Sequence, residues 1–217
     1  VGHAGTLDPL ATGVLVVGVG QATRLMEYVQ RMEKVYQAVV FLGAVSATDD
    51  AEGPITFGAQ AAVPEPGQVR SALDAFVGEI AQVPPAFSAA HVDGRRAYAL
   101  ARRGRPAVLA PRQVRIHEIQ LLGLVGPRLE LQIRCGKGTY VRALARDLGR
   151  VLGCGAFLES LRRLRIGPLD LEQAIPLDTT PEEARRRLLP LGLAAGDPPA
   201  LPLHPDQARR VQQGQCV

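Results

Sequence analysis

The chain has 217 residues, of which 47% are apolar and 4% aromatic, so one sizeable domain, or one domain with part of a second, can form around Leu, Val and Ala. No apolar run reaches the roughly 20 residues that a membrane-spanning helix needs, which argues against a membrane protein. The three cysteines suit neither a disulfide framework nor a zinc site, so we expect reduced thiols and a cytoplasmic protein.

The first third of the chain alternates short apolar runs with polar turns. We predict a buried strand over residues 14–19, a helix over residues 22–31 and a strand over residues 35–42. A polar loop follows at residues 46–54. Pro and Gly residues then mark the start of a helix over residues 68–77.

The second half contains longer apolar segments. A basic helix is predicted over residues 95–103, followed by strands over residues 114–125 and 129–135. Their short connection indicates antiparallel neighbours. A further strand covers residues 161–166. Because strands and helices do not alternate strictly, the pattern predicts an α+β fold.

The clearest helix covers residues 139–152. Its apolar residues make one stripe, and Arg142, Arg146 and Arg150 make a basic stripe beside it. After residue 190 the chain becomes rich in Pro, Gly and Ala and is typical of a linker. The last residues, from 205 on, begin a helical pattern.

Positive charge is concentrated in the middle of the chain. Residues 95–165 hold 16 basic and 4 acidic side chains, net +12, whereas residues 1–94 hold 4 basic and 10 acidic ones, net −6. Almost all of these cations are Arg, which binds phosphate oxygens in a bidentate way. The segment therefore indicates either a nucleic-acid surface or solvated, Arg-rich helix faces.

One acidic residue lies in an unusual setting. Asp8 is surrounded by small residues in Gly-His-Ala-Gly-Thr-Leu-Asp-Pro at residues 2–9. Glycines allow a close approach of the backbone to a ligand, and Asp-Pro fixes an extended turn. This setting suits a rigid catalytic carboxylate, although an ordinary turn Asp is the simpler interpretation of the residue alone.

Residues 2–9 resemble the catalytic signature of the TruB family, which converts uridine to pseudouridine at position 55 in the T-arm of tRNA. Four further blocks resemble the family in the same order: Lys-Val-Tyr at residues 34–36, residues 82–98, Gly-Lys-Gly-Thr-Tyr-Val-Arg at residues 136–142, and Gly-Cys-Gly-Ala with Leu-Arg-Arg-Leu at residues 153–164. The loop at residues 46–50 departs from the family pattern T-D-T-x-D at its first two positions but retains Asp50.

The resemblance implies the roles of individual residues. Asp8 is then the catalytic residue, Tyr36 packs on the target base, and Arg142 pairs with the catalytic carboxylate. The RNA-binding residues implied in the same way are His3, Lys137, Tyr140, Leu161, Arg162 and Arg163. The reaction recycles its own base, so we expect no cofactor and no metal.

The resemblance also implies the fold and its organisation. We expect a mixed, largely antiparallel sheet flanked by helices, with a central RNA-binding cleft. Residues 1–180 form the catalytic domain without the family's N-terminal segment, residues 181–203 a helix and linker, and residues 204–217 the start of a truncated PUA-like domain. The expected partner is the T-arm of tRNA, bound by a monomer.

Two other functions are compatible with parts of the sequence. An RNA-binding or tRNA-folding protein, with secondary or lost catalysis, needs the basic surface but not Asp8. A Rossmann-like oxidoreductase is suggested by Gly-Val-Gly-Gln-Ala-Thr at residues 18–23, but the third Gly of the dinucleotide fingerprint is missing. Within the enzyme hypothesis, the residues leave open whether Asp8 attacks C1′ or removes the C2′ proton.

Overall fold

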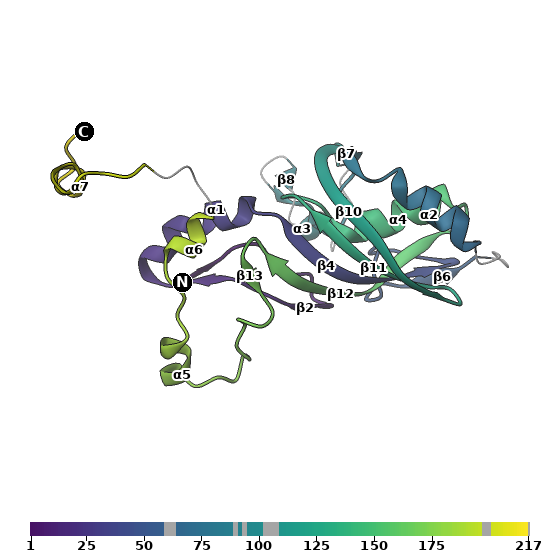
Figure 1. Ribbon diagram of the computed structural model, residues 1–217. Helices are drawn as coiled ribbons and strands as arrows, with labels where there is room; N and C mark the ends of the chain where they lie inside the picture. The colour runs from purple at the N-terminus through teal and green to yellow at the C-terminus, as the bar shows by residue number, and fades with distance from the viewer. Residues whose placement is uncertain (59–63, 89–90, 93–94, 102–108, 197–200, 217) are drawn as a thin grey trace.

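The computed structural model describes residues 1–58, 64–88, 91–92, 95–101, 109–196 and 201–216. Its framework is a seven-stranded sheet (Figure 1). The strand order is β13 (Leu169–Asp170), β12 (Ala156–Ile166), β4 (Lys34–Leu42), β11 (Arg128–Cys135), β10 (Arg112–Val125) and β7 (Gly78–Gln82), with β2 (Ala11–Gly13) also on β12. Only the β2–β12 pair is parallel. The α+β fold and the antiparallel β10–β11 pair are therefore confirmed.

Smaller elements surround this sheet. Three two-stranded ladders pair β1 (Gly2–His3) with β3 (Val17–Gly18), β5 (Ala44–Ser46) with β6 (Ile55–Phe57), and β8 (His91–Val92) with β9 (Arg95–Arg96). The helices are the 3-10 helix η1 (Gly20–Leu25), α1 (Met26–Arg31), α2 (Pro66–Asp74), α3 (Ala97–Ala101), α4 (Val141–Val151), α5 (Pro181–Arg186), α6 (Gly192–Ala195) and α7 (Pro205–Gln212).

The main core lies between one face of the sheet and helices α2 and α4 (Figure 1). Alternation along the strands places every second side chain on this face. The buried residues include Tyr36, Ala38, Val40 and Leu42 of β4, Leu129, Leu131 and Ile133 of β11, and Val141, Leu144, Ala145 and Leu148 of α4. The apolar stripe predicted for α4 is thus the surface that packs on the sheet.

A second, smaller core supports the N-terminal segment. Ala4, Val14, Met26 and Val29 pack with Ile166 and Leu169 of β12 and β13. At the end of α1, the Lys34 ammonium donates to the carbonyls of Gln30 and Met32, at 2.5 Å each. The segment that carries Asp8 is therefore packed against the end of the main sheet.

Two predicted elements differ from the structure. Residues 14–19 form no buried strand: only Val17 and Gly18 pair, and Leu15, Val17 and Val19 are exposed. Buried and exposed side chains alternate along this segment, so its apolar composition alone did not predict which residues are buried. In the helix predicted over residues 95–103, the first two residues belong to β9 and the helix spans Ala97–Ala101; residues 102 and 103 lie outside the described residues.

Among the residues that the structure describes, no helix is both long and apolar enough to cross a membrane.

Helix α4 packs tightly against the start of β12 at Gly149. A Cβ atom placed there would lie 2.1 Å from the Ala156 nitrogen, which belongs to the backbone and cannot rotate away. Only a residue without a side chain therefore allows this packing distance.

We expect Gly149→Ala to lower the free energy of unfolding by about 1–3 kcal/mol, because the added methyl group forces α4 away from β12. Urea unfolding measures the change. Gly67→Ala is the matched control, since nothing lies within 4 Å of a Cβ at Gly67 in α2 and Ala favours the helix. A Gly149→Ala protein as stable as the wild type would show that the contact is not tight.

A candidate active site at the start of helix α4

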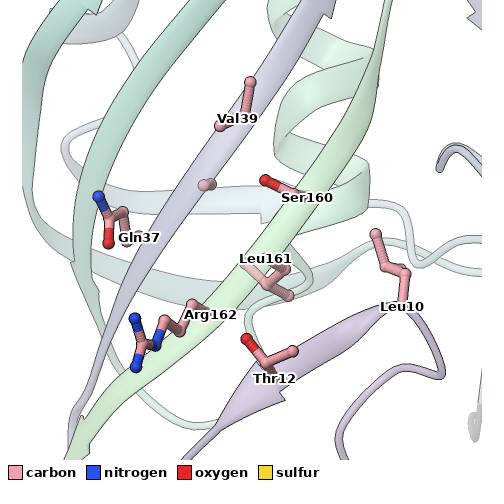
Figure 2. Close-up of a pocket in the computed structure, with 8 residues that line it drawn as sticks. Leu10, Thr12, Gln37, Val39, Ser160, Leu161 and Arg162 are labelled. Atoms are coloured by element: carbon pink, nitrogen blue, oxygen red, sulfur yellow. The ribbon is translucent and has the colours of Figure 1, made fainter.

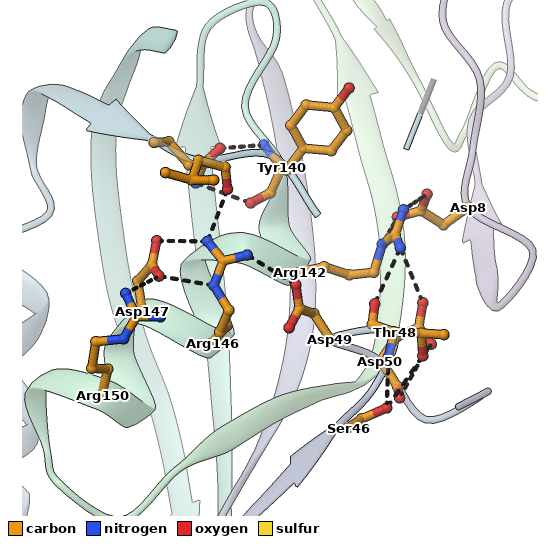
Figure 3. A network of polar contacts seen from close by, with 12 residues as sticks. Asp8, Ser46, Thr48, Asp49, Asp50, Tyr140, Arg142, Arg146, Asp147 and Arg150 are labelled. Carbon is orange, nitrogen blue, oxygen red and sulfur yellow. Dashed lines mark hydrogen bonds and ion pairs between the residues drawn. The ribbon is translucent and has the colours of Figure 1, made fainter. Parts of the chain in front are cut away.

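Asp8 and Arg142 form a two-pronged ion pair between the N-terminal segment and α4. Arg142 Nε donates to Asp8 Oδ2 at 2.8 Å, and Arg142 Nη2 donates to Asp8 Oδ1 at 2.6 Å (Figure 3). The expected contact between these residues, 134 positions apart, is therefore present. The Arg142 side chain is 5% exposed and that of Asp8 27%, so the carboxylate alone is partly open to solvent.

The other edge of the Arg142 guanidinium is held by the loop between β5 and β6. Arg142 Nη1 lies 3.4 Å from Asp50 Oδ2 and donates to the Thr48 carbonyl at 3.3 Å. Asp50 is itself buried and accepts hydrogen bonds from the Thr48 hydroxyl and the Glu52 N–H. A buried guanidinium that is bonded along both edges has a fixed orientation. This loop therefore aims Arg142 at Asp8.

Arg163 holds the backbone of the segment that carries Asp8. Its side chain is buried, and it donates to the carbonyl of Val14 at 2.7 Å and to that of Gly5 at 3.2 Å. These two acceptors lie on either side of Asp8 in the chain. The Arg163 guanidinium is therefore directed into the protein, at these carbonyls and at the Tyr36 hydroxyl, and the RNA contact expected for it stays a prediction.

Tyr36 lies next to this support. It pairs with Arg163 across the β4–β12 ladder and is 9% exposed. Burial raises the pKa of the Tyr36 phenol above its ordinary value, and the Asp8 charge raises it further, while Arg163 acts in the opposite direction. Tyr36 is therefore a neutral hydrogen-bond donor near neutral pH, and not a phenolate base.

The residues at the middle of β12 face opposite sides of the sheet. Leu161 is packed into the main core, on the same face as Tyr36. Successive side chains of a strand alternate, so the exposed Arg162 projects from the other face. There it borders a hollow of about 260 Å³, whose other lining residues are Leu10, Thr12, Gln37, Ala38, Val39, Ser160 and Leu161 (Figure 2). Arg162 is thus separated by the sheet from Tyr36.

Tyr140, which precedes α4, is fixed by a residue whose role the sequence did not reveal. The Gln82 amide accepts from the Tyr140 N–H at 2.8 Å and donates to the Tyr140 carbonyl at 3.1 Å. Gln82 is 2% exposed and ends the edge strand β7. The Gln82 amide therefore forms with the Tyr140 backbone the same pair of hydrogen bonds that a peptide group of a neighbouring strand would form. These bonds hold the backbone in place where α4 begins.

The remaining predicted RNA-binding residues lie at the surface. His3 and Lys137 are exposed, and Tyr140 is half-buried. Ala89 and Gly94 of the family-like block at residues 82–98 lie outside the described residues. In the described part of the chain, no group of three or more His, Cys, Asp or Glu side chains is arranged to hold a metal ion.

Comparison with protein families matches the chain over most of its length. The family model described as the N-terminal domain of TruB family pseudouridylate synthase matches residues 1–141. The model described as the C-terminal domain of tRNA pseudouridylate synthase B matches residues 142–190.

Similar curated proteins carry the same description. tRNA pseudouridine synthase B of Dinoroseobacter shibae is 43% identical over 98% of this chain and 72% of its own length. The Thermobifida fusca protein of the same name is 45% identical over 100% of this chain and 76% of its own length.

Solved structures show the same fold. A Cbf5–Nop10–Gar1 complex contains a chain with a TM-score of 0.66 and 28% identity, over 89% of this chain and 52% of that one. An H/ACA RNP bound to a substrate RNA containing 2′-deoxyuridine gives a TM-score of 0.57 and 28% identity, over 80% of this chain and 41% of that one. The chain thus spans about half the length of these solved chains or less.

The raised pKa of Tyr36 has a measurable consequence. We expect Tyr36 to ionise in a late step, above the ordinary range of a tyrosine, in an ultraviolet absorbance titration, which no Trp obscures. The unfolded chain loses this proton at about pH 10. The Tyr36 contribution to the free energy of unfolding is therefore complete below that pH and is lost as the pH rises through the folded-state pKa. Tyr36→Phe removes the late step; persistence of that step would contradict the assignment.

The double hydrogen bond of Gln82 can be made sensitive to pH. We expect Gln82→Glu to lower the free energy of unfolding by about 1–3 kcal/mol at neutral pH, because a carboxylate still accepts from the Tyr140 N–H but repels the Tyr140 carbonyl. Protonation restores the donor, so stability recovers toward acid pH. Thermal melting across pH measures this, and the exposed Gln113→Glu, which should show no such recovery, is the control.

Proposed function

The chain belongs to the TruB family of pseudouridylate synthases, and from that membership we propose that it isomerises uridine to pseudouridine at position 55 in the T-loop of tRNA, with Asp8 as the catalytic residue. The observation that carries the proposal is the two-pronged Asp8–Arg142 pair. It holds a partly exposed carboxylate rigidly at the edge of a buried polar network.

The chemistry of the reaction fits a single held carboxylate. The N1–C1′ bond of uridine breaks, the uracil rotates, and a C5–C1′ bond forms, while the C5 proton is released and N1 takes up a proton. Breaking the glycosidic bond builds positive charge at the sugar, which a carboxylate next to C1′ and C2′ can stabilise. Because Arg142 holds Asp8 in place before substrate binds, little reorganisation is needed at the moment of reaction.

Two further side chains are proposed to contact the target base. A uridine inside a folded loop must be extruded before Asp8 can reach its sugar, at a cost of a few kcal/mol. Tyr36 offers a ring on which the extruded base can stack, and its neutral hydroxyl can donate a hydrogen bond. Leu161 lies on the same face of the sheet as Tyr36 and supplies an apolar contact.

Surface residues are proposed to bind the surrounding RNA. His3 lies in β1, which precedes Asp8, and Lys137 and Tyr140 lie in the loop that precedes Arg142. All three are at least partly exposed. Arg162 projects from the opposite face, so any phosphate that it binds belongs to another part of the tRNA. We further propose that the protein acts as a monomer on the T-arm, in the cytoplasm, where tRNA is its substrate.

The proposal is tested by mapping pseudouridine in a T-arm stem-loop RNA. We expect Asp8→Asn to lower the rate on the order of 10⁴-fold, because the amide keeps the shape but not the charge of the catalytic group. Arg142→Lys should lower the rate by about 10²-fold, since an ammonium cannot reproduce the fork.

Binding of the same RNA by Asp8→Asn serves as the control and should remain close to that of the wild type. A wild-type rate in Asp8→Asn would overturn the proposed mechanism. A wild-type protein that binds the RNA tightly but forms no pseudouridine would favour the RNA-binding alternative.

A further inference from the structure

A second arginine lies on α4 one turn after Arg142. Arg146 Nη1 donates to Asp49 Oδ2 at 3.0 Å, and Arg146 Nη2 donates to the Val83 carbonyl at 2.8 Å (Figure 3). Its Nε and Nη2 also donate to the two carboxylate oxygens of Asp147, at 3.0 and 3.2 Å. Arg146 therefore joins α4 to the β5–β6 loop and to the segment after β7.

Asp49 adopts a backbone conformation that L-residues rarely adopt. Its φ angle is 62°, and among the described residues it alone has a positive φ without being a glycine. The conformation is fixed by its neighbours: the Asp49 N–H donates to the Ser46 carbonyl, and the Asp49 carbonyl accepts from the Leu158 N–H at 3.0 Å. A residue held in this region has its side chain directed by the backbone, and such outliers concentrate at functional sites.

Asp49 is close enough to the active-site arginine to interact with it. It immediately precedes Asp50, which pairs with Arg142, and its side chain is 17% exposed. Burial raises the pKa of Asp49, while the charges of both Arg146 and Arg142 act in the opposite direction. Arg142 is thus paired with Asp8 and Asp50, and its charge also reaches Asp49, whose own ion pair is with Arg146.

We propose that Arg146 is a positioning residue for the reaction: it binds the Asp49 carboxylate and so keeps Asp49 from drawing the Arg142 fork away from Asp8. The inference rests on the proposed function only for its effect on rate. Without Arg146, the Arg142 guanidinium would have to divide its hydrogen bonds between the carboxylates of Asp8 and Asp49. Only the arrangement in which Arg142 bonds to Asp8 orients the Asp8 carboxylate.

A simple brace between loops is the competing explanation. In that case Arg146 and Asp49 stabilise the protein as partners, and removal of either one has the same effect. The proposed role differs, because without Arg146 the Asp49 carboxylate disturbs the Arg142–Asp8 pair and lowers the rate. The two roles therefore predict opposite results for a variant that lacks both charges.

The experiment compares pseudouridine formation on T-arm RNA by the wild type, Arg146→Gln, Asp49→Asn and the double variant. Asn tolerates a positive φ, so Asp49→Asn leaves the backbone in place. We expect Arg146→Gln to lower kcat by about 10- to 100-fold with KM changed less than about threefold, Asp49→Asn to stay near the wild type, and the double variant to recover to within about threefold. A double variant no faster than Arg146→Gln would overturn the proposal.

Two controls separate this role from a loss of folding. Arg146→Lys keeps a positive charge beside Asp49 without the fork, so it should retain most of kcat; a loss as large as that of Arg146→Gln would support the brace instead. Melting temperatures of all variants set the assay temperature below the lowest transition.

A crystal structure of Arg146→Gln tests the inference without any activity. We expect the Arg142 fork to contact Asp49 in that variant, and an unchanged Arg142–Asp8 pair would overturn the inference. An inactive wild type, in contrast, would overturn the proposed function and leave this structural result standing.

Discussion

The structure depends on how the positive charge of Arg142 is compensated inside the protein. A buried guanidinium is stable only when its donors are bonded, and loss of one partner of a buried pair costs roughly 3–5 kcal/mol. Asp8, Thr48 and Asp50 supply those partners from two loops that are separate in sequence. The need to satisfy one cation therefore brings the N-terminal segment and the β5–β6 loop to the same end of α4. Of the two carboxylates that pair with Arg142, that of Asp8 is partly exposed and that of Asp50 is buried.

The alternation of side chains along β12 assigns different tasks to neighbouring residues. Leu161 packs beside Tyr36, Arg162 projects from the opposite face, and Arg163 holds the Asp8 segment through its backbone carbonyls. Three adjacent residues that the family resemblance assigns together to RNA binding thus lie in the apolar core, on the outer surface and in the internal support of the Asp8 segment. The pleat of the strand, and not residue type, decides which of them can meet RNA.

Local patterns in the sequence predicted much of the sheet and of α4, because periodic burial leaves a periodic signal. The Asp8–Arg142 contact had no local signal and came only from the family resemblance. The sequence left open whether the basic stripe of α4 faces a nucleic acid or solvent, since the acidic partners of Arg142 and Arg146, which are Asp8, Asp49 and Asp50, are far away in the sequence. The hydrogen bonds of Gln82 could not be predicted either, although the residue begins the family-like block at residues 82–98, because an amide that pairs with Tyr140 like a peptide group has no sequence signature. The burial of Arg163 could not be predicted, because it depends on carbonyls that only the folded chain brings near the side chain.

The segment that carries Asp8 is attached on both sides. Before Asp8, β1 is paired to β3; after it, β2 is paired to β12, and Arg163 bridges the carbonyls of Gly5 and Val14. Because the segment between β1 and β2 is hydrogen-bonded to the rest of the protein at both ends, it cannot move away from the sheet as a lid does. In the proposed reaction the Asp8 carboxylate therefore keeps its place, and the RNA loop must open to bring the sugar of the target nucleotide to it.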